Sequence, residues 1–118
     1  MLYTNLKHIE SADELSRIIN NNENVMVICG RMEPQCVPVF RIAEELESEY
    51  ANVKYYDMEY DNPESMVIRT LPELSGLTGI PFAVYYKNGI VVKTTSGIQT
   101  KDEVVANLES EFEAEIHA

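Results

Sequence analysis

A continuous apolar run, VMVIC from Val25 to Cys29, is the strongest constraint on the fold of this chain. The run has the length of a strand, and its uninterrupted apolar character is typical of a central strand that is covered on both faces. VKYYDM, which begins at Val53, predicts a second buried strand. Amphipathic helical patterns alternate with these runs. Such alternation indicates parallel strands joined by helical crossovers.

Start and stop signals place the helices. The capping-box pattern SADE at Ser11 and the pattern TKDE at Thr100 each precede apolar residues at helical spacing. A further helix is expected after the second cysteine, running to about Tyr50. The sequence DNP predicts another helix with Pro63 at its first position, ending before Pro72. NLKHI, near the N-terminus, is interpreted as a short first strand.

The clearest local signal is Asn88-Gly89, which stands between FAVYYK and IVVKTT and predicts an antiparallel hairpin. The expected order is therefore strand-helix-strand-helix-strand-helix-strand-strand-helix. This order predicts an α/β fold, in which a mixed central sheet of parallel strands plus a C-terminal antiparallel hairpin carries helices on both faces. A chain of 118 residues without repeats or linkers is expected to form one domain, 1–118.

Charge and composition exclude several classes of function. Nine basic residues against twenty acidic ones give a formal net charge of −11, which disfavours nucleic acid and anionic membranes as partners. The N-terminal stretch becomes polar before an apolar segment develops, so no signal peptide is expected. No apolar run approaches the length of a membrane span. We therefore expect a cytoplasmic protein that acts as a monomer.

The chain has two cysteines, Cys29 and Cys36. A permanent structural disulfide is not expected in a reducing compartment. The open choices are a redox pair, part of a metal site, or two inert core thiols. For a metal the supporting ligands are poor, because His8 and His117 each lie near a terminus and no second cysteine pair exists. We expect neither a metal nor a cofactor.

The spacing of the cysteines allows a pair only if the chain turns back on itself. A disulfide requires Cα atoms about 4.4–6.8 Å apart, which residues seven apart in an extended chain cannot reach. Cys29 ends a predicted strand and Cys36 begins a predicted helix, and Gly30 and Pro34 supply bends between them. In sheets of this kind, function gathers beyond the carboxyl ends of the parallel strands.

Reactivity of the two thiols depends on how readily each one ionises. A helix N-terminus and the nearby Arg31 favour the thiolate of Cys36, whereas Glu33 disfavours it. Cys29 is expected to be half-buried, with a raised pKa. We therefore assign the attacking role to Cys36 and the resolving role to Cys29.

Several segments resemble the thioredoxin family: LKHIES, YDNP, GLTGIPFAVYYKNG and SGIQTKDEVVANLES. The resemblance covers nearly the whole chain, and the stretch from Gly79 to Gly89 is its most specific part. Between Asn62 and Gly76 the chain is several residues longer than is usual in that family. The resemblance implies a thioredoxin-like fold.

The family's active-site motif, W-C-G-P-C, is altered. An alignment without gaps places Met32 on the tryptophan, Glu33 on the first, attacking cysteine and Cys36 on the second cysteine. Val27 then takes the place of the family's buried acid. A gapped alignment keeps a C-x6-C pair instead and makes Cys29 the attacking thiol.

By the same resemblance, Ile80-Pro81 is a cis peptide beside the cysteine loop, where the Ile80 backbone pairs with an extended substrate. Ile80, Pro81, Met32 and Glu33 are thus the expected substrate-binding residues. The implied activity is that of an atypical thioredoxin in cell redox homeostasis and electron transport. It would reduce protein disulfides by a Cys29/Cys36 dithiol–disulfide cycle and be recharged by a thioredoxin-reductase-like flavoprotein.

Two alternatives stay open. The chain could be a redox-inactive thioredoxin-like module that binds extended polypeptide as an adaptor or chaperone. It could also be a single-thiol carrier that uses Cys36 with an external thiol such as glutathione. Inert thiols in the core would favour the binding module, because free cysteine often simply fills space.

Overall fold

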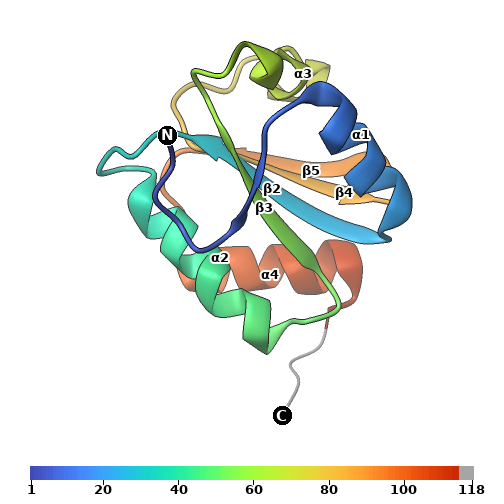
Figure 1. Cartoon of the computed structure of the whole chain (residues 1–118). Coiled ribbons are helices and arrows are strands. Elements are labelled where there is room, and N and C mark those ends of the chain that lie inside the picture. The colour runs from blue at the N-terminus through green and yellow to red at the C-terminus, as the bar shows by residue number, and fades with distance from the viewer. Residues whose placement is uncertain (115–118) are drawn as a thin grey trace.

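The computed structural model describes residues 1–114, so the histidine near the C-terminus, His117, lies outside the described residues. The order of elements is the predicted one, and the predicted mixed sheet is confirmed (Figure 1). The strands are β1 (Lys7–Ile9), β2 (Asn24–Gly30), β3 (Lys54–Glu59), β4 (Phe82–Lys87) and β5 (Ile90–Ser96). The helices are α1 (Ala12–Asn21), α2 (Val37–Glu49), α3 (Met66–Arg69) and α4 (Lys101–Phe112), with short 3-10 turns η1 (Pro63–Ser65) and η2 (Pro72–Leu74).

The sheet has five strands in the order β1-β3-β2-β4-β5. Strand β3 pairs in parallel with β1 and with β2, while β4 runs antiparallel to both β2 and β5. Strand β2 thus lies at the centre, and all seven of its residues are buried. This position explains its uninterrupted apolar run, because helices cover it from both sides.

The local signals act as predicted. Asn88 and Gly89 both have positive φ, 52° and 80°, as a two-residue hairpin turn of the kind they favour requires. Thr100 forms a full capping box with Glu103 at the start of α4. The helical segment after β3 begins at Pro63 and ends before Pro72, as predicted, but it consists of a 3-10 turn and a helix of only four residues, and a second 3-10 turn starts at Pro72.

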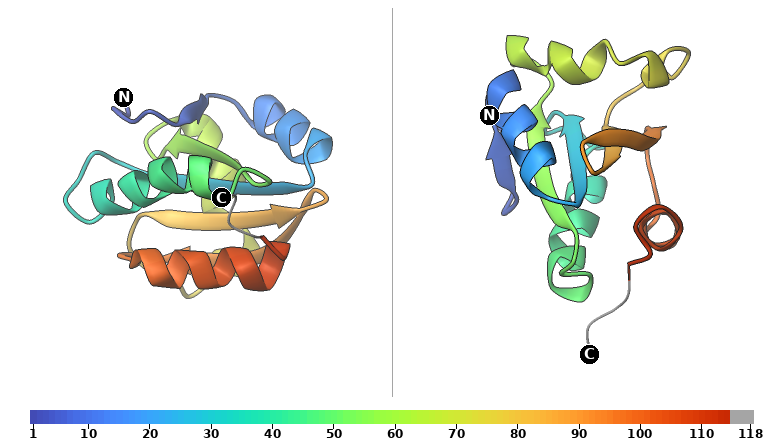
Figure 2. Two further views of the ribbon diagram at one scale, coloured as in Figure 1. Left: turned by 90° about the horizontal axis from the view of Figure 1, so that it is seen from below. Right: turned by 90° about the vertical axis from the view of Figure 1, so that its right-hand side faces the viewer.

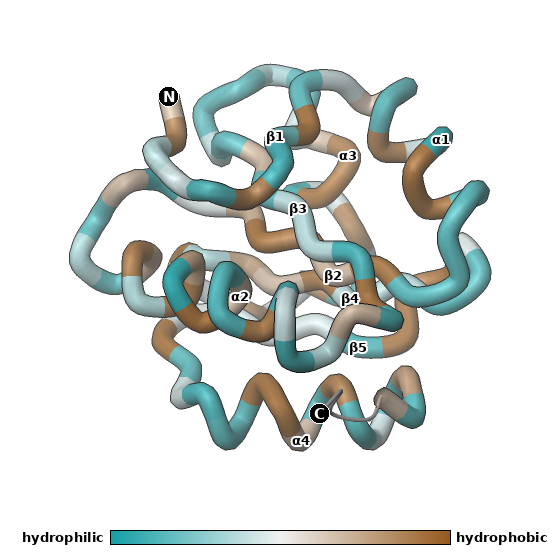
Figure 3. The backbone as a smooth tube through the Cα atoms, turned by 60° about the horizontal axis from the view of Figure 1, so that its bottom comes forward, coloured by the Kyte–Doolittle hydropathy of each residue, from teal (hydrophilic) through white to brown (hydrophobic). Residues whose placement is uncertain are grey.

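The sheet separates two cores (Figure 2). The first core, which we call the α2/α4 core, contains residues of α2 and α4 such as Phe40 and Leu108, together with Met26 and Ile28 of β2. Along α4, apolar residues recur between hydrophilic ones (Figure 3). The second, the α1/α3 core, contains Leu15 of α1 and Ile68 of α3. Alternate residues of β2 therefore enter opposite cores.

The N-terminal segment, Met1 to Leu6, leads into the edge strand β1 and packs on the side of the α2/α4 core. Leu2 and Leu6 are buried in this core, and the Thr4 hydroxyl donates a hydrogen bond to the carboxylate of Asp57 in β3. The segment is therefore an integral part of the packing. Within residues 1–114 no helix is both long enough and apolar enough to cross a membrane.

Candidate functional site

The cysteine loop, Arg31 to Cys36, joins the end of β2 to the start of α2. Cys36 is the N-cap residue of α2, so it stands at the start of a helix as predicted, and a proline occupies the first turn of that helix. The carbonyl of Glu33 accepts hydrogen bonds from the amides of Cys36 (2.9 Å) and Val37 (3.0 Å), which closes the turn. The loop lies at the carboxyl ends of the parallel strands, where this architecture gathers function.

The two thiols point to opposite faces of the sheet. Cys29 belongs to the α1/α3 core and Cys36 belongs to the α2/α4 core, and both are free thiols. Gly30, the next residue of β2, faces Cys36 instead: a Cβ atom built on Gly30 would lie 3.0 Å from the Cys36 Sγ atom. Because side chains alternate along a strand, Cys29 points away from Cys36. A bond between them requires the end of β2 to rotate.

Cys29 is fully buried, so the expectation of a half-buried thiol is wrong. Strand β2 is central, and α1 and α3 seal the face into which Cys29 points. The expected direction of its pKa is found: burial raises the pKa of Cys29 to about 12. The guanidinium of Arg69 and a hydrogen bond from Ser65 act in the opposite direction and are outweighed.

Cys36 is also fully buried. Burial raises its pKa, and the carboxylate of Glu33 adds to the increase. A hydrogen bond from the backbone of Arg31, together with the positive charge of that residue, lowers the pKa but does not compensate. The thiolate that a helix N-terminus was expected to favour at Cys36 is therefore not favoured in this conformation, because desolvation outweighs the dipole.

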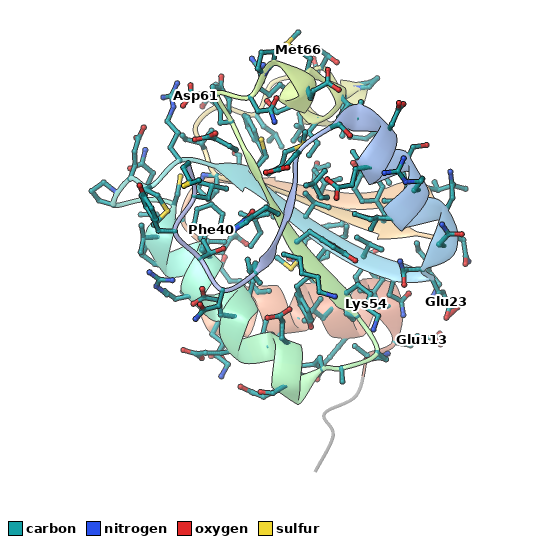
Figure 4. All side chains as sticks on the ribbon, viewed as in Figure 1. Glu23, Phe40, Lys54, Asp61, Met66 and Glu113 are labelled. Carbon is teal, nitrogen blue, oxygen red and sulfur yellow. The ribbon has the colours of Figure 1, made fainter. Side chains whose placement is uncertain are left out.

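Arg31 fastens the loop to the turn that follows β3. Its guanidinium donates to both carboxylate oxygens of Asp61, at 2.8 and 2.7 Å, and to Glu33 at 3.3 Å. It also lies over the ring of Tyr60, 4.8 Å from the centroid. Asp61, labelled in Figure 4, has its pKa lowered by the hydrogen bond from Arg31. Sequence reasoning interpreted this acidic residue only as part of a helix start.

A rim of four predicted residues surrounds Cys36. The Ile80–Pro81 peptide is cis, as predicted. Pro81 and Cys36 both approach Gly30, and Met32 and Ile80 are half-buried against the α2/α4 core to which Cys36 belongs. The remaining rim residue, Glu33, is bound to the Cys36 amide as described above. The structure thus brings these four residues together at one edge of the sheet.

The backbone of Ile80 is available for pairing. The next residue along, Pro81, already accepts a hydrogen bond from the amide of Gly97 at 3.0 Å. In residues 1–114, neither the amide nor the carbonyl of Ile80 has a backbone partner. Such groups at the end of a strand can receive a further extended chain.

A buried acid does occur, but not at the expected place. Val27 carries no charge, whereas Asp57 on the neighbouring strand β3 is fully buried and binds the Nδ1 atom of His8 at 2.6 Å. Burial raises the pKa of Asp57, although its hydrogen bonds from Thr4 and His8 oppose the increase. The signal in the sequence was an aspartate inside the apolar run VKYYDM. For the described residues, no group of three His, Cys, Asp or Glu side chains could hold a metal ion.

Comparison with solved structures identifies the class of protein. No protein-family model and no curated protein matches the chain. A thioredoxin from Plasmodium falciparum is 28% identical, with a TM-score of 0.71, and the match covers 90% of this chain and 99% of that one. An N21Q thioredoxin from Halobacterium salinarum has a TM-score of 0.75 at 17% identity, covering 93% of this chain and 95% of that chain.

Mitochondrial thioredoxin 3 of Saccharomyces cerevisiae, in its oxidised form, has a TM-score of 0.74 at 13% identity, covering 89% of this chain and 94% of that one. These matches, with the observed sheet order, define a thioredoxin fold. The resemblance to thioredoxins seen in the sequence is thus confirmed at the level of the fold. The alignment without gaps, which puts Glu33 at the position of the attacking cysteine of thioredoxins, stays a prediction.

Proposed function

We propose that this chain binds extended segments of other polypeptides at the rim beside Cys36, with both of its thiols reduced. The observation that carries this choice over a disulfide cycle is the placement of the thiols. Cys29 and Cys36 are fully buried in different cores, on opposite faces of β2. A buried, protonated thiol is a poor nucleophile, since the thiolate is the reactive form.

The rim itself supports binding of an extended chain. The free amide and carbonyl of Ile80 can pair with the backbone of a partner, as in strand addition to a sheet edge. Met32 and Ile80, both half-buried, offer apolar contacts on either side of Cys36. Main-chain pairing supplies affinity that depends little on sequence, and side-chain contacts supply selectivity. These are the properties expected of an adaptor or a chaperone.

A second candidate is thiol–disulfide exchange, with disulfide-containing proteins as substrates. It is supported by the position of Cys36 as the N-cap of α2, hydrogen-bonded by the Arg31 backbone. Once the loop opens, the Cys36 thiolate attacks a substrate disulfide and releases one substrate thiol. Cys29 then attacks Cys36 in the mixed disulfide and releases the second thiol, leaving a Cys29–Cys36 disulfide. Two electrons from a thioredoxin-reductase-like flavoprotein, in a reducing cytoplasm, restore the dithiol.

One pair of measurements separates the candidates. Intact mass after thiol alkylation, over a series of redox potentials, reports whether the two cysteines become blocked together. In parallel, anisotropy of a labelled, reduced and unfolded polypeptide reports binding by the native protein and by Cys36→Ser. We expect no two-electron step, and we expect binding that Cys36→Ser leaves unchanged. A cooperative Cys29–Cys36 disulfide with a defined midpoint, and no binding, would establish the second candidate instead.

A further inference from the structure

We propose that Tyr60 is a positioning residue for both cysteines, and that it couples the conformation around one thiol to the other across the sheet. This inference concerns the reactivity of the thiols and does not depend on the proposed polypeptide binding. It rests on the position of Tyr60, directly after β3, between the cysteine loop and the α3 segment. In the sequence, Tyr60 stood out only as the first residue of the YDNP segment.

The ring of Tyr60 holds two arginines from different parts of the chain. Arg31 of the cysteine loop lies 4.8 Å from the ring centroid, and Arg69 at the end of α3 lies 4.9 Å from it. Guanidinium groups are attracted to the negative face of an aromatic ring. Phe82 of β4 contacts the same ring, with centroids 6.4 Å apart, and helps to fix its orientation.

The backbone of Tyr60 is also hydrogen-bonded on both sides, to the cysteine-loop side and to the α3 side. Its amide donates to the carbonyl of Gly30, at 2.9 Å, at the point where β2 becomes the cysteine loop. Its carbonyl accepts a hydrogen bond of 2.7 Å from the buried hydroxyl of Ser65 in η1. Ring and backbone therefore connect the loop side with the α3 side through one residue.

Each of the two arginines interacts with one of the two thiols. The backbone of Arg31 donates to Cys36, and its charge acts on that thiol. Arg69 donates to Ser65 at 2.8 Å, and both residues act on Cys29. The chain of contacts thus runs from Cys36 through Arg31, Tyr60, Arg69 and Ser65 to Cys29, although the two thiols face opposite cores.

Other charged and titratable groups near the thiols act more locally. Glu33 raises the pKa of Cys36, and Asp61 raises that of Cys29. Tyr86, on β4, has a Coulombic interaction with Cys29. Asp61 binds Arg31 and also has a Coulombic interaction with Arg69, but Tyr60 is the side chain over which both guanidinium groups lie. Tyr60 is therefore the side chain through which a displacement of the cysteine loop can reach the cover of Cys29.

The test is a coupling measurement. Cys36 is first capped with methyl methanethiosulfonate, whose sulfenyl sulfur is attacked by the Cys36 thiolate to form an S–S bond while methanesulfinate leaves. The cap adds bulk beside Gly30, where a Cβ atom would lie only 3.0 Å from the Cys36 sulfur, and so displaces the loop. The rate of Cys29 alkylation is then compared in capped and uncapped protein by peptide mass spectrometry.

In the native protein we expect capping to accelerate Cys29 alkylation about fivefold, at the lower end of typical coupling between sites. Tyr60→Phe keeps the ring and is expected to keep this factor, whereas Tyr60→Leu is expected to reduce it to about one. Tyr56→Leu is the matched control, because Tyr56 is a half-buried tyrosine of β3 for which no arginine contact occurs within residues 1–114.

The ratio distinguishes positioning from a merely structural role. Loss of packing alone would change both alkylation rates and leave their ratio as in the native protein, which would overturn the proposal. A ratio of about one in the native protein would overturn it as well. If Tyr60→Leu does not fold, Arg69→Gln cuts the same chain of contacts and is expected to abolish the coupling. Binding at the rim is measured separately, so its failure is distinguishable.

Discussion

The surroundings of the two cysteines differ between the two sides of β2. On the side of the α1/α3 core, Cys29 is one residue inside a central strand and is covered by helices, with Ser65 and Arg69 as its polar neighbours. On the other side, Cys36 is the N-cap residue of α2 and ends the cysteine loop. Both thiols are fully buried, but Cys29 belongs to a central strand and Cys36 to the junction of a loop and a helix. We therefore expect the two thiols to differ in reactivity. Their side chains also point to opposite faces of the sheet.

The largest effect is expected from a new cysteine on the face of β2 that is turned toward Cys36, where it can form a disulfide with Cys36. A Cβ atom at Gly30 lies 3.0 Å from the Cys36 sulfur, which is about the distance from a Cβ to the far sulfur of a disulfide with ordinary bond lengths. Under mild oxidation we expect most Gly30→Cys molecules to link the introduced cysteine to Cys36. The natural pair is expected to stay reduced.

Peptide mapping without reductant measures both links. Adding Cys29→Ser to Gly30→Cys should leave the yield unchanged, which excludes a contribution from Cys29. A Cys29–Cys36 link that forms as readily in the native protein would show that the end of β2 turns freely, and would remove the distinction between the two sides.

A second effect concerns stability at alkaline pH. Burial raises the pKa of Cys29 to about 12, so the folded state keeps this proton over a range in which the unfolded chain releases it. The protonated Cys29 thiol therefore contributes fully to the unfolding free energy below about pH 9, and this contribution is lost as the pH rises toward about 12. Between about pH 8 and about pH 10.5 the native protein should therefore lose about 2 kcal/mol more unfolding free energy than Cys29→Ala.

Urea denaturation at the two pH values measures this difference. The buried tyrosines Tyr55, Tyr85 and Tyr86 also have raised pKa values. The contributions of Tyr55 and Tyr85 are common to both proteins and cancel in the comparison, and that of Tyr86 cancels apart from its Coulombic interaction with Cys29. Equal losses in the two proteins would mean that Cys29 is solvated in the native state.

A third difference should appear in the native rates of modification. Cys29 is covered by helices, so its alkylation should follow global unfolding and rise steeply with urea. Cys36 needs only a local opening of the loop, so its alkylation should be about tenfold faster in water and less sensitive to urea. Mass spectrometry of timed alkylations resolves the two sites. Identical urea dependence would indicate that the loop and the core open together.

The smallest effect is expected from loss of the ion pair between Arg31 of the cysteine loop and Asp61. The Arg31–Asp61 pair is exposed to solvent, and exposed ion pairs contribute little to stability. Asp61→Asn should therefore accelerate the alkylation of Cys36 by about 1.5- to 5-fold, with a smaller change at Cys29. Asp102→Asn, in the first turn of α4, is the matched control and should change neither rate. Added salt should reduce the difference between Asp61→Asn and the native protein.

The sequence predicted what local signals determine. The hairpin at Asn88-Gly89, the capping box at Thr100 and the order of elements followed from patterns within a few residues. The family resemblance located the rim at Ile80 and Pro81. Each of these features depends on neighbours along the chain or on motifs with a fixed spacing.

The direction of the two thiols was harder to predict. Alternation along β2 puts Cys29 on the side of Val25 and Val27, but the burial of both faces removes the polar residues that would show which side is which. The contacts of Tyr60 with Arg31 and Arg69 join segments that are far apart in the sequence. The hydrogen bonds between Arg31 and Asp61 likewise join residues about thirty positions apart. No local pattern encodes such contacts.

The N-terminal segment has a practical consequence. The amide of Tyr3 contacts the Met32 sulfur at 3.3 Å, Thr4 binds Asp57, and the terminal amine of Met1 binds Glu59. A bulky label attached at Tyr3 or Thr4 would disturb these contacts, one of which reaches the cysteine loop at Met32. Assays of the two thiols are therefore better built with these residues unlabelled.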